Sequence, residues 1–147
     1  MKGESLPRLT ENRILHYLDL AKNACQYSDN HKARLGSVII YKNKVISVGW
    51  NVENKTNPLQ KEYNYLRGYD PNVSFAKNTI HAEISALVKI KNMNIDFKKA
   101  HLFVYRIKKN GENGYARPCA ACMGFAKSLG IQHIYFSTET NWSYERI

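Results

Sequence analysis

The sequence has few cysteines, few acidic residues and no long apolar run. Three cysteines, Cys25, Cys119 and Cys122, are an odd number. With no secretory signal, this number favours a reducing compartment over a disulfide framework. The longest apolar runs, such as 37–41 and 102–105, are far too short to cross a bilayer. The first residues lead into no apolar segment of the kind found in secretory signals. We therefore expect a cytoplasmic protein with no membrane partner.

The shortage of acidic residues leaves a strong positive charge. Twelve acidic residues against 22 lysines and arginines give a formal net charge of +10. Such an excess suits either a small substrate that carries phosphate or the backbone of a nucleic acid. The basic residues are spread over several segments, however, and scattered lysines usually form a solvated surface. Charge alone therefore does not establish polynucleotide binding.

The length and composition are those of one ordinary folded domain. Of the 147 residues, 44% are hydrophobic and 23% are charged, which excludes a disordered chain and allows a sizeable core. No internal repeat or low-complexity tract interrupts the sequence. We expect a single domain over residues 1–147.

Hydrophobic spacing predicts a helix, a hairpin, and then helices alternating with strands. Thr10 can cap a helix over 11–27, in which Ile14, Leu18, Ala21 and Cys25 recur at helical spacing. The β-branched segments 37–41 and 45–50 predict a hairpin with its turn at 42–44. A polar segment, 51–78, follows and contains a helical turn at 61–66.

The second half of the chain predicts two further helices and two strands. A helix over 81–91, with Thr79 as a possible cap, precedes a strand over 100–107 and a turn-rich loop over 108–117. A helix over 119–129 ends at Gly130, and a strand over 131–137 follows. This order predicts an α/β fold with one mixed sheet, in which the last two strands are parallel because a helix connects them.

Two short motifs supply the ligands of a zinc site. His81-Ala82-Glu83 provides one histidine, and Pro118-Cys119-Ala120-Ala121-Cys122 provides two cysteines. Three protein ligands leave the fourth position of a tetrahedral zinc open, which distinguishes a catalytic site from a structural one. Glu83 lies two residues from the histidine, where it can move protons to and from a metal-bound water. Both motifs fall where a predicted helix begins, and a helix N-terminus favours thiolates.

Other roles for these residues stay open at this point. Cys119 and Cys122 have the spacing of a redox pair, although the His81 motif argues against that role. A structural zinc would need a fourth ligand, and none of the candidates has zinc-finger spacing; they are His16, His31, His101 and His133. Cys25 ends an apolar stripe and is expected to be a small core residue.

With these motifs, the chain resembles the cytidine/deoxycytidylate deaminase superfamily over about residues 34–138. The resemblance implies a three-layer α/β/α fold with a mixed four- or five-stranded sheet. It implies that His81, Cys119 and Cys122 bind Zn²⁺ and that Glu83 is the catalytic proton shuttle. It further implies that Asn51, in Gly49-Trp50-Asn51, contacts the sugar of the substrate and that the backbone N–H of Ala82 faces the base.

The length of the 51–78 segment is the main indication of the substrate. Deoxycytidylate deaminases have a long segment between the corresponding Asn and His, whereas tRNA adenosine deaminases have a short one. The resemblance therefore favours deamination of a free cytosine nucleotide, dCMP to dUMP. The segment lacks Cys and His, so we expect no additional zinc in it.

Two alternatives remain. One is a deaminase that acts on RNA or single-stranded DNA, which the net charge and Tyr63, Tyr65 and Tyr69 favour. The other is a basic nucleic-acid-binding domain that keeps zinc only for stability.

The chain departs from its relatives in two places. The 108–117 stretch is an insertion that places Arg117 just before the Pro-Cys motif, where it either meets a phosphate or faces solvent. The tail after residue 138 is short, so either 142–147 forms an edge strand or the sheet has four strands. Trp142 or Tyr144 are candidates to close the pocket. By analogy with its relatives, we expect a homo-oligomer.

Overall fold

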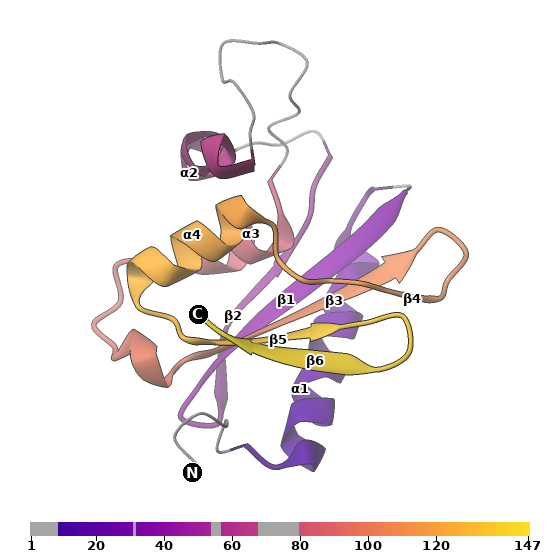
Figure 1. The fold of residues 1–147 in the computed structure, drawn as a ribbon, viewed down its shortest axis with the longest axis horizontal. Helices are drawn as coiled ribbons and strands as arrows, with labels where there is room; N and C mark the ends of the chain where they lie inside the picture. The colour runs from indigo at the N-terminus through magenta and orange to yellow at the C-terminus, as the bar shows by residue number, and fades with distance from the viewer. Residues whose placement is uncertain (1–8, 31, 54–56, 68–79) are drawn as a thin grey trace.

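A mixed β-sheet with helices on both faces forms the centre of the computed structural model (Figure 1). The structure describes residues 9–30, 32–53, 57–67 and 80–147. The helices among them are α1 (Glu11–Ala24), α2 (Pro58–Tyr63), α3 (Ala82–Val88) and α4 (Ala120–Leu129), with short 3₁₀ turns at Cys25–Tyr27, Asn64–Arg67 and Phe97–Lys99. The strands are β1 (Ala33–Tyr41), β2 (Lys44–Trp50), β3 (His101–Lys108), β4 (Asn113–Gly114), β5 (His133–Ser137) and β6 (Trp142–Arg146). None of these helices is long and apolar enough to cross a membrane.

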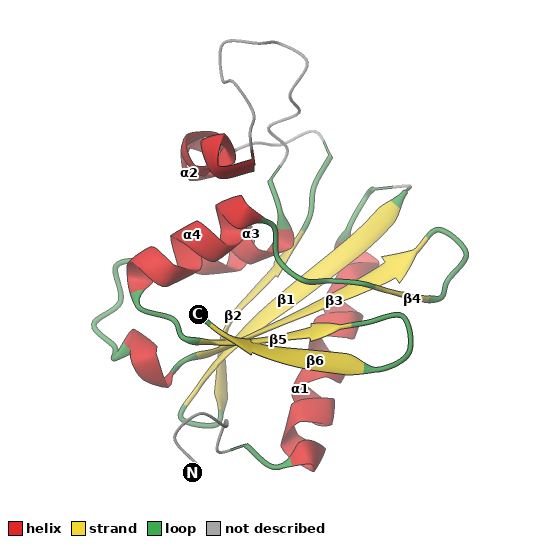
Figure 2. Cartoon of the chain, in the orientation of Figure 1, coloured by secondary structure: helices red, strands yellow, loops and turns green. Residues whose placement is uncertain are grey.

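The sheet has the order β2-β1-β3-β5-β6, with β4 paired to β3 beside this path (Figure 2). β3 and β5 are parallel and joined through α4, as the sequence predicts, and all the other pairs are antiparallel. β6 is an edge strand, so the tail does supply a strand, and with β4 the sheet has six strands where four or five were expected. The expected 108–117 loop contains an additional short strand, because Gly114 folds back to pair with Arg106.

The α/β/α layering follows from the burial of alternate strand residues on opposite faces. On one face, Phe103 and Tyr135 pack against the α1 residues Tyr17 and Leu18. On the other face, residues such as Leu102, Val104 and Ile134 pack against α3 and α4. Because both faces are covered, the middle of each central strand is a continuous buried apolar run rather than an alternating pattern. The expected three-layer fold is confirmed.

The local predictions for the first half of the chain are largely confirmed. Thr10 caps α1, and its Oγ1 accepts a hydrogen bond from the backbone N–H of Arg13 at 3.2 Å. Cys25 is a fully buried core residue whose Sγ lies 3.5 Å from the carbonyl oxygen of Tyr105. The hairpin turns through Lys42 and Asn43, both with positive φ, which is the backbone geometry that two-residue hairpins prefer.

Three close contacts fix α3 against the sheet. The Ser37 hydroxyl donates to the carbonyl oxygen of Ala82 at 2.7 Å, and the Ser47 hydroxyl donates to that of Ala86 at 2.7 Å. Between them, Gly49 lets the backbone of α3 approach so closely that an added Cβ would lie 2.4 Å from the Ala82 oxygen. The helix is shorter than predicted and its N-cap is His81. The proposed cap Thr79 lies outside the described residues.

Candidate metal centre and substrate cleft

The starts of α3 and α4 bring the three predicted metal ligands together. His81 and Cys119 are the N-cap residues of these helices, both with extended backbone, and Cys122 lies in the first turn of α4. His81 Nδ1 lies 3.5 Å from Cys119 Sγ and 3.4 Å from Cys122 Sγ, and the two sulfur atoms are 3.7 Å apart. The predicted convergence of two helix starts is therefore observed.

These distances fit a tetrahedral zinc ion. Zinc–sulfur bonds of about 2.3 Å and zinc–nitrogen bonds of about 2.05 Å at tetrahedral angles separate two sulfurs by about 3.8 Å, and sulfur from nitrogen by about 3.6 Å. The observed separations agree within about 0.2 Å. Within the described part of the chain, this is the one cluster of three such ligands.

The other described histidines do not complete a four-ligand structural site. His101 Nδ1 contacts the Tyr135 hydroxyl at 2.9 Å, and His133 Nδ1 contacts the Tyr144 hydroxyl at 2.7 Å. Both belong to the face of the sheet that α1 covers, away from the metal cluster. His16 stacks on Tyr17, and His31 lies outside the described residues. Three ligands with an open fourth position are the pattern of a catalytic zinc.

Glu83 lies in the first turn of α3 beside the cluster. Its side chain is only 2% exposed, and its Oε1 has no hydrogen-bond partner among the described residues. Burial raises the pKa of this carboxyl to about 7, with a further contribution from Cys119. A carboxyl that titrates near neutral pH can both accept and release a proton, as general acid–base catalysis requires.

Cys119 favours the anionic form that metal binding needs. The hydrogen bond with Cys122 lowers the pKa of Cys119 to about 3 against the opposing effect of burial, and His81 adds to the lowering. The direction agrees with the sequence-based expectation of a thiolate. The neighbouring side chains are the leading cause, rather than the helix N-terminus alone.

Gln60 is a positioning residue that sequence reasoning missed. It lies in α2, is fully buried, and its Oε1 accepts the backbone N–H of His81 at 3.0 Å. Its own Nε2 donates to Asn64 Oδ1 at 2.9 Å. Part of the 51–78 segment is thus attached to the metal site. A lone glutamine in a polar segment carries no pattern that would have indicated this contact.

A cleft of about 420 Å³ opens beside the metal cluster. Its lining includes His81, Ala82, Glu83 and Cys119, and also Asn51 and Arg117 from the predicted substrate contacts. Cys122 is not among the lining residues; it is fully buried behind the cleft. The cleft therefore brings together the predicted catalytic and substrate-binding residues and leaves one of the two thiols inside the protein.

The Asn51 side chain is already held in place by the backbone of β1. Its Oδ1 accepts from the Leu35 N–H at 2.9 Å and from the Ser28 hydroxyl at 2.6 Å, and its Nδ2 donates to the Ala33 carbonyl at 3.0 Å. An amide nitrogen carries two hydrogens, so one remains to contact a ligand. Asn51 is thus a structural residue that also lines the cleft.

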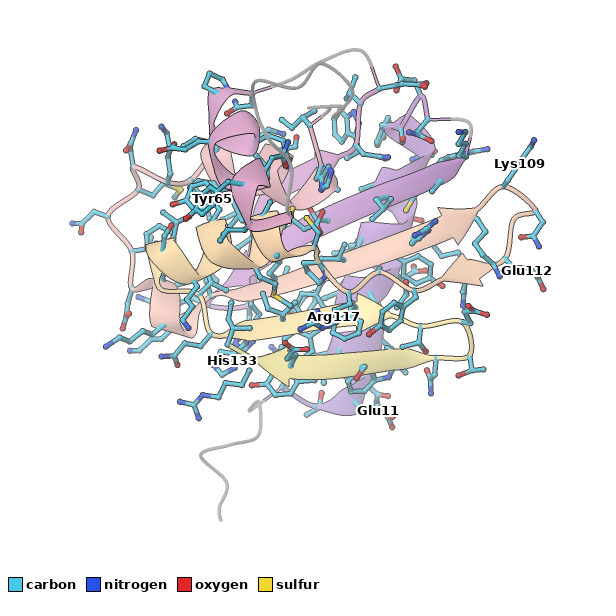
Figure 3. All side chains as sticks on the ribbon, turned by 45° about the horizontal axis from the view of Figure 1, so that its top comes forward. Glu11, Tyr65, Lys109, Glu112, Arg117 and His133 are labelled. Carbon is cyan, nitrogen blue, oxygen red and sulfur yellow. The ribbon has the colours of Figure 1, made fainter. Side chains whose placement is uncertain are left out.

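Arg117 lies at the rim of the cleft and is paired with β6. Its Nε and Nη2 donate to the two carboxylate oxygens of Glu145, both at 2.8 Å, and Figure 3 shows it above β5 and β6. This pairing raises the pKa of Arg117 and lowers that of Glu145.

Trp142 and Tyr144 pack on the face of the sheet that α1 covers, so the expectation that either closes the pocket is wrong. Successive residues of a strand point to opposite faces, so Tyr144 and Trp142 lie on one face of β6 and Glu145 on the other.

Arg106 is the second residue that sequence reasoning missed. It lies near the end of β3, lines the cleft, and has a buried Nε without a hydrogen-bond partner among the described residues. In the sequence it is one more basic residue beside an insertion. The two described tyrosines of the 51–78 segment do not line the cleft: Tyr63 packs on Phe125, and Tyr65 is exposed. Tyr69 lies outside the described residues.

Comparison with known proteins agrees with this geometry. A model of the cytidine and deoxycytidylate deaminase zinc-binding region matches residues 11–138. The chain belongs to the cytidine and deoxycytidylate deaminase family. It is therefore a zinc-dependent hydrolase that deaminates a nucleoside or nucleotide, and Zn²⁺ is its cofactor. No curated protein sequence matches this deaminase significantly.

Solved structures share the fold of this deaminase at low sequence identity. A dCMP deaminase from the cyanophage S-TIM5 in apo form superposes with a TM-score of 0.58 and 20% identity, covering 90% of this chain and 87% of that one. The same phage enzyme in complex with dCMP and dUMP gives a TM-score of 0.57 and 18% identity, with coverages of 89% and 85%. A cytidine deaminase from Burkholderia pseudomallei gives a TM-score of 0.60 and 16% identity, with coverages of 94% and 93%.

Proposed function

We propose that this deaminase converts dCMP to dUMP and releases ammonia. The observation that carries the proposal is the buried Glu83 carboxyl beside the His81–Cys119–Cys122 cluster, in the lining of a cleft large enough for a nucleotide. The long segment between Asn51 and His81 and the net charge of +10 favour a substrate with a phosphate. A structural neighbour that is a dCMP deaminase supports the same choice.

The roles of the residues follow from their positions. When bound, zinc supplies a Lewis acid that lowers the pKa of a coordinated water. Glu83 accepts a proton from the water that attacks C4 and passes it to the ring nitrogen N3. It then carries the remaining proton of the new C4 hydroxyl to the amine, which leaves as ammonia while the C4 carbonyl forms. The balance is dCMP plus water to dUMP plus ammonia.

The substrate contacts use donors that the fold has already oriented. The remaining amide hydrogen of Asn51 contacts a sugar hydroxyl, and the N–H of Ala82, at the first position of α3, faces the base. N–H groups in the first turn of a helix have no partner within the helix and are available to a ligand. Arg117 contributes at the rim while it keeps its bond to Glu145.

The test is a substrate panel with a proton-transfer variant. Zinc-loaded protein is incubated with dCMP, CMP, deoxycytidine and single-stranded oligonucleotides, and the formation of ammonia and uracil is followed. We expect dCMP to be the best substrate. We also expect Glu83→Gln to lose turnover while its zinc content, measured by atomic absorption, stays at that of the wild type. Efficient turnover of oligonucleotides with none of dCMP would contradict the proposal.

A polynucleotide deaminase is the second candidate, and a basic pocket favours it. This pocket, about 270 Å³ in volume, is lined by Lys32, Arg34, Lys108 and Lys109 and shares Asn30, Lys32 and Ala33 with the cleft. Nucleotides that flank a target base would bring their phosphates to such a surface. The oligonucleotide arm of the panel, repeated at rising salt, decides between the two candidates. If no substrate is turned over and zinc removal unfolds the protein, a purely structural zinc is supported instead.

The family resemblance also supports a homo-oligomeric assembly as part of this proposal. Several large apolar side chains are exposed, among them Tyr65 at 61% and Leu66 at 40%, in the 3₁₀ turn after α2. Analytical ultracentrifugation of the zinc-loaded protein tests this part. A monomer at micromolar concentration would contradict it.

A further inference from the structure

The Arg106 side chain lines the cleft near the end of β3. It belongs to the face of the sheet that α3 and α4 cover, together with Leu102 and Val104, because side chains alternate along a strand. Directly across the sheet it pairs with Leu35 on one side and with Gly114 on the other. Its aliphatic stem fills the space that a side chain at position 114 would take, since a Cβ there would lie 2.8 Å from Arg106 Cγ.

The guanidinium of Arg106 has no partner within the described part of the chain. Its Nε is buried without a hydrogen bond, and none of the described ion pairs, hydrogen bonds or ring contacts involves its side-chain nitrogens. An unsatisfied buried donor is costly to a folded protein, and more so when it carries a charge. A ligand with a negative charge would remove this cost.

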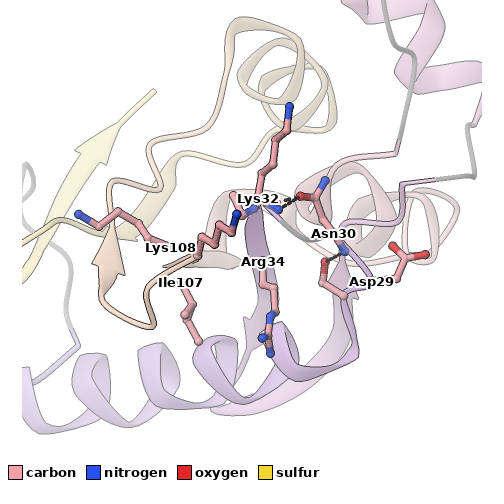
Figure 4. A pocket seen from close by; sticks show the side chains of 9 residues that line it. Asp29, Asn30, Lys32, Arg34, Ile107 and Lys108 are labelled. Atoms are coloured by element: carbon pink, nitrogen blue, oxygen red, sulfur yellow. Dashed lines mark hydrogen bonds between the residues drawn. The ribbon is translucent and has the colours of Figure 1, made fainter.

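The other cationic groups around the cleft are less suited to an anion inside it. Arg117 is already neutralised by two hydrogen bonds to Glu145. In the basic pocket, Figure 4 shows Lys32 and Arg34 extending in opposite directions. Lys108 pairs with Glu139 at 3.9 Å. These side chains do not converge on one anion.

We propose that Arg106 binds the phosphate of the nucleotide substrate. This inference rests on the proposed function and names the residue that distinguishes a nucleotide from a nucleoside. The planar fork of an arginine offers two parallel N–H donors to a phosphate, a geometry that a lysine does not reproduce.

The position of Arg106 relative to Asn51 supports this assignment. The Leu35 N–H donates to Asn51 Oδ1, and Leu35 is the residue opposite Arg106 across the β1–β3 pair. Arg106 therefore lies next to the part of the cleft where Asn51 would contact the sugar. The metal ligands come from the helix starts instead. A nucleotide with its base at the metal and its sugar at Asn51 directs its phosphate toward Leu35 and Arg106.

The experiment compares a nucleotide with its nucleoside in matched variants. We expect Arg106→Gln to lower kcat/KM for dCMP by about 10- to 100-fold, the range for loss of a hydrogen bond to a charged group, and to leave deoxycytidine unchanged. Arg106→Lys should recover part of the loss. Arg13→Gln is the control, because Arg13 is an exposed arginine of α1, on the opposite face of the sheet, and its loss removes the same charge. We expect this control to leave kcat/KM unchanged for both dCMP and deoxycytidine.

Binding measurements separate this inference from the proposed function. Calorimetric titration of dCMP and deoxycytidine into zinc-loaded Glu83→Gln protein, with and without Arg106→Gln, needs no turnover. If adding Arg106→Gln to Glu83→Gln weakens the binding of dCMP but not that of deoxycytidine, the phosphate contact is supported, even if the wild type does not deaminate dCMP. Equal losses for both ligands, or no loss, would overturn the inference while leaving dCMP turnover by the wild type as evidence for the proposed function. Unchanged thermal unfolding of Arg106→Gln confirms that the variant folds.

Discussion

Gly49→Ala is the perturbation that tests most directly how the fold places the metal site. A Cβ at residue 49 would lie 2.4 Å from the Ala82 oxygen and 2.5 Å from the Ala86 nitrogen. Both atoms are backbone of α3, so no side-chain rotation can relieve the overlap. An ordinary contact of 3.4 Å or more would require the helix to move by about 1 Å. Overpacking of this kind typically costs about 1–3 kcal/mol.

The functional consequence follows from what α3 carries. His81 directly precedes this helix and Glu83 lies in its first turn. A displacement of about 1 Å in catalytic groups commonly reduces turnover by about 100-fold. We therefore expect Gly49→Ala to lose stability, zinc affinity and activity together. Urea unfolding, competition with a chromogenic zinc chelator and dCMP turnover measure the three quantities.

Gly124→Ala is the matched control on the neighbouring helix. The nearest atom to its added Cβ is Leu66 Cδ1 at 2.4 Å, but this is the end of a side chain that is 40% exposed and free to move. In addition, alanine is favoured over glycine inside a helix by about 0.5–1 kcal/mol. We expect this variant to match or exceed the wild type in stability. If the free energy of unfolding of Gly49→Ala is also within about 0.5 kcal/mol of the wild-type value, and the variant keeps its activity, the close packing of α3 does not position the site.

Three further predictions concern the groups around the same helix. With zinc removed by chelation, Glu83→Gln should be more stable than the wild type by about 3 kcal/mol above pH 7 and equal to it below about pH 4.5. The reason is that burial raises the pKa of Glu83 from about 4.5 to about 7, so between these pH values the folded wild type binds more protons than its unfolded state and loses stability as the pH rises. Urea unfolding of both proteins across this pH range measures the effect. If the two proteins show the same dependence of stability on pH, the prediction is wrong. Ser37→Ala should cost about 1–3 kcal/mol in thermal unfolding, since it leaves the buried Ala82 carbonyl without its donor, and a change below 0.5 kcal/mol would exclude that role. Gln60→Met, similar in size, removes the acceptor of the His81 N–H and should weaken zinc binding in chelator competition; unchanged affinity would show that Gln60 serves only packing.

The zinc site could be predicted from the sequence because its ligands lie in two short local motifs. His81-Ala82-Glu83 and Pro118-Cys119-Ala120-Ala121-Cys122 each span one helix start, and helix starts can be recognised from local spacing and capping. The alternation of helices and strands in the second half of the chain likewise predicts the parallel β3–β5 pair. Such features depend on residues close in the chain, which local physical chemistry constrains.

Tertiary structure alone decided which more distant residues meet the site. Gln60 reaches His81 from the 51–78 segment, and Arg106 is exposed to the cleft because β1 and β4 lie on either side of it. The direction of the tail residues also depended on the register of β6, which turns Glu145 toward Arg117 and packs Trp142 and Tyr144 on the other face. A one-residue shift in register reverses every side chain of a strand, and sequence patterns in a short, half-exposed edge strand do not fix that register. The sequence by itself therefore determined the metal chemistry of this protein, whereas only the packing of its sheet determined which groups surround the substrate.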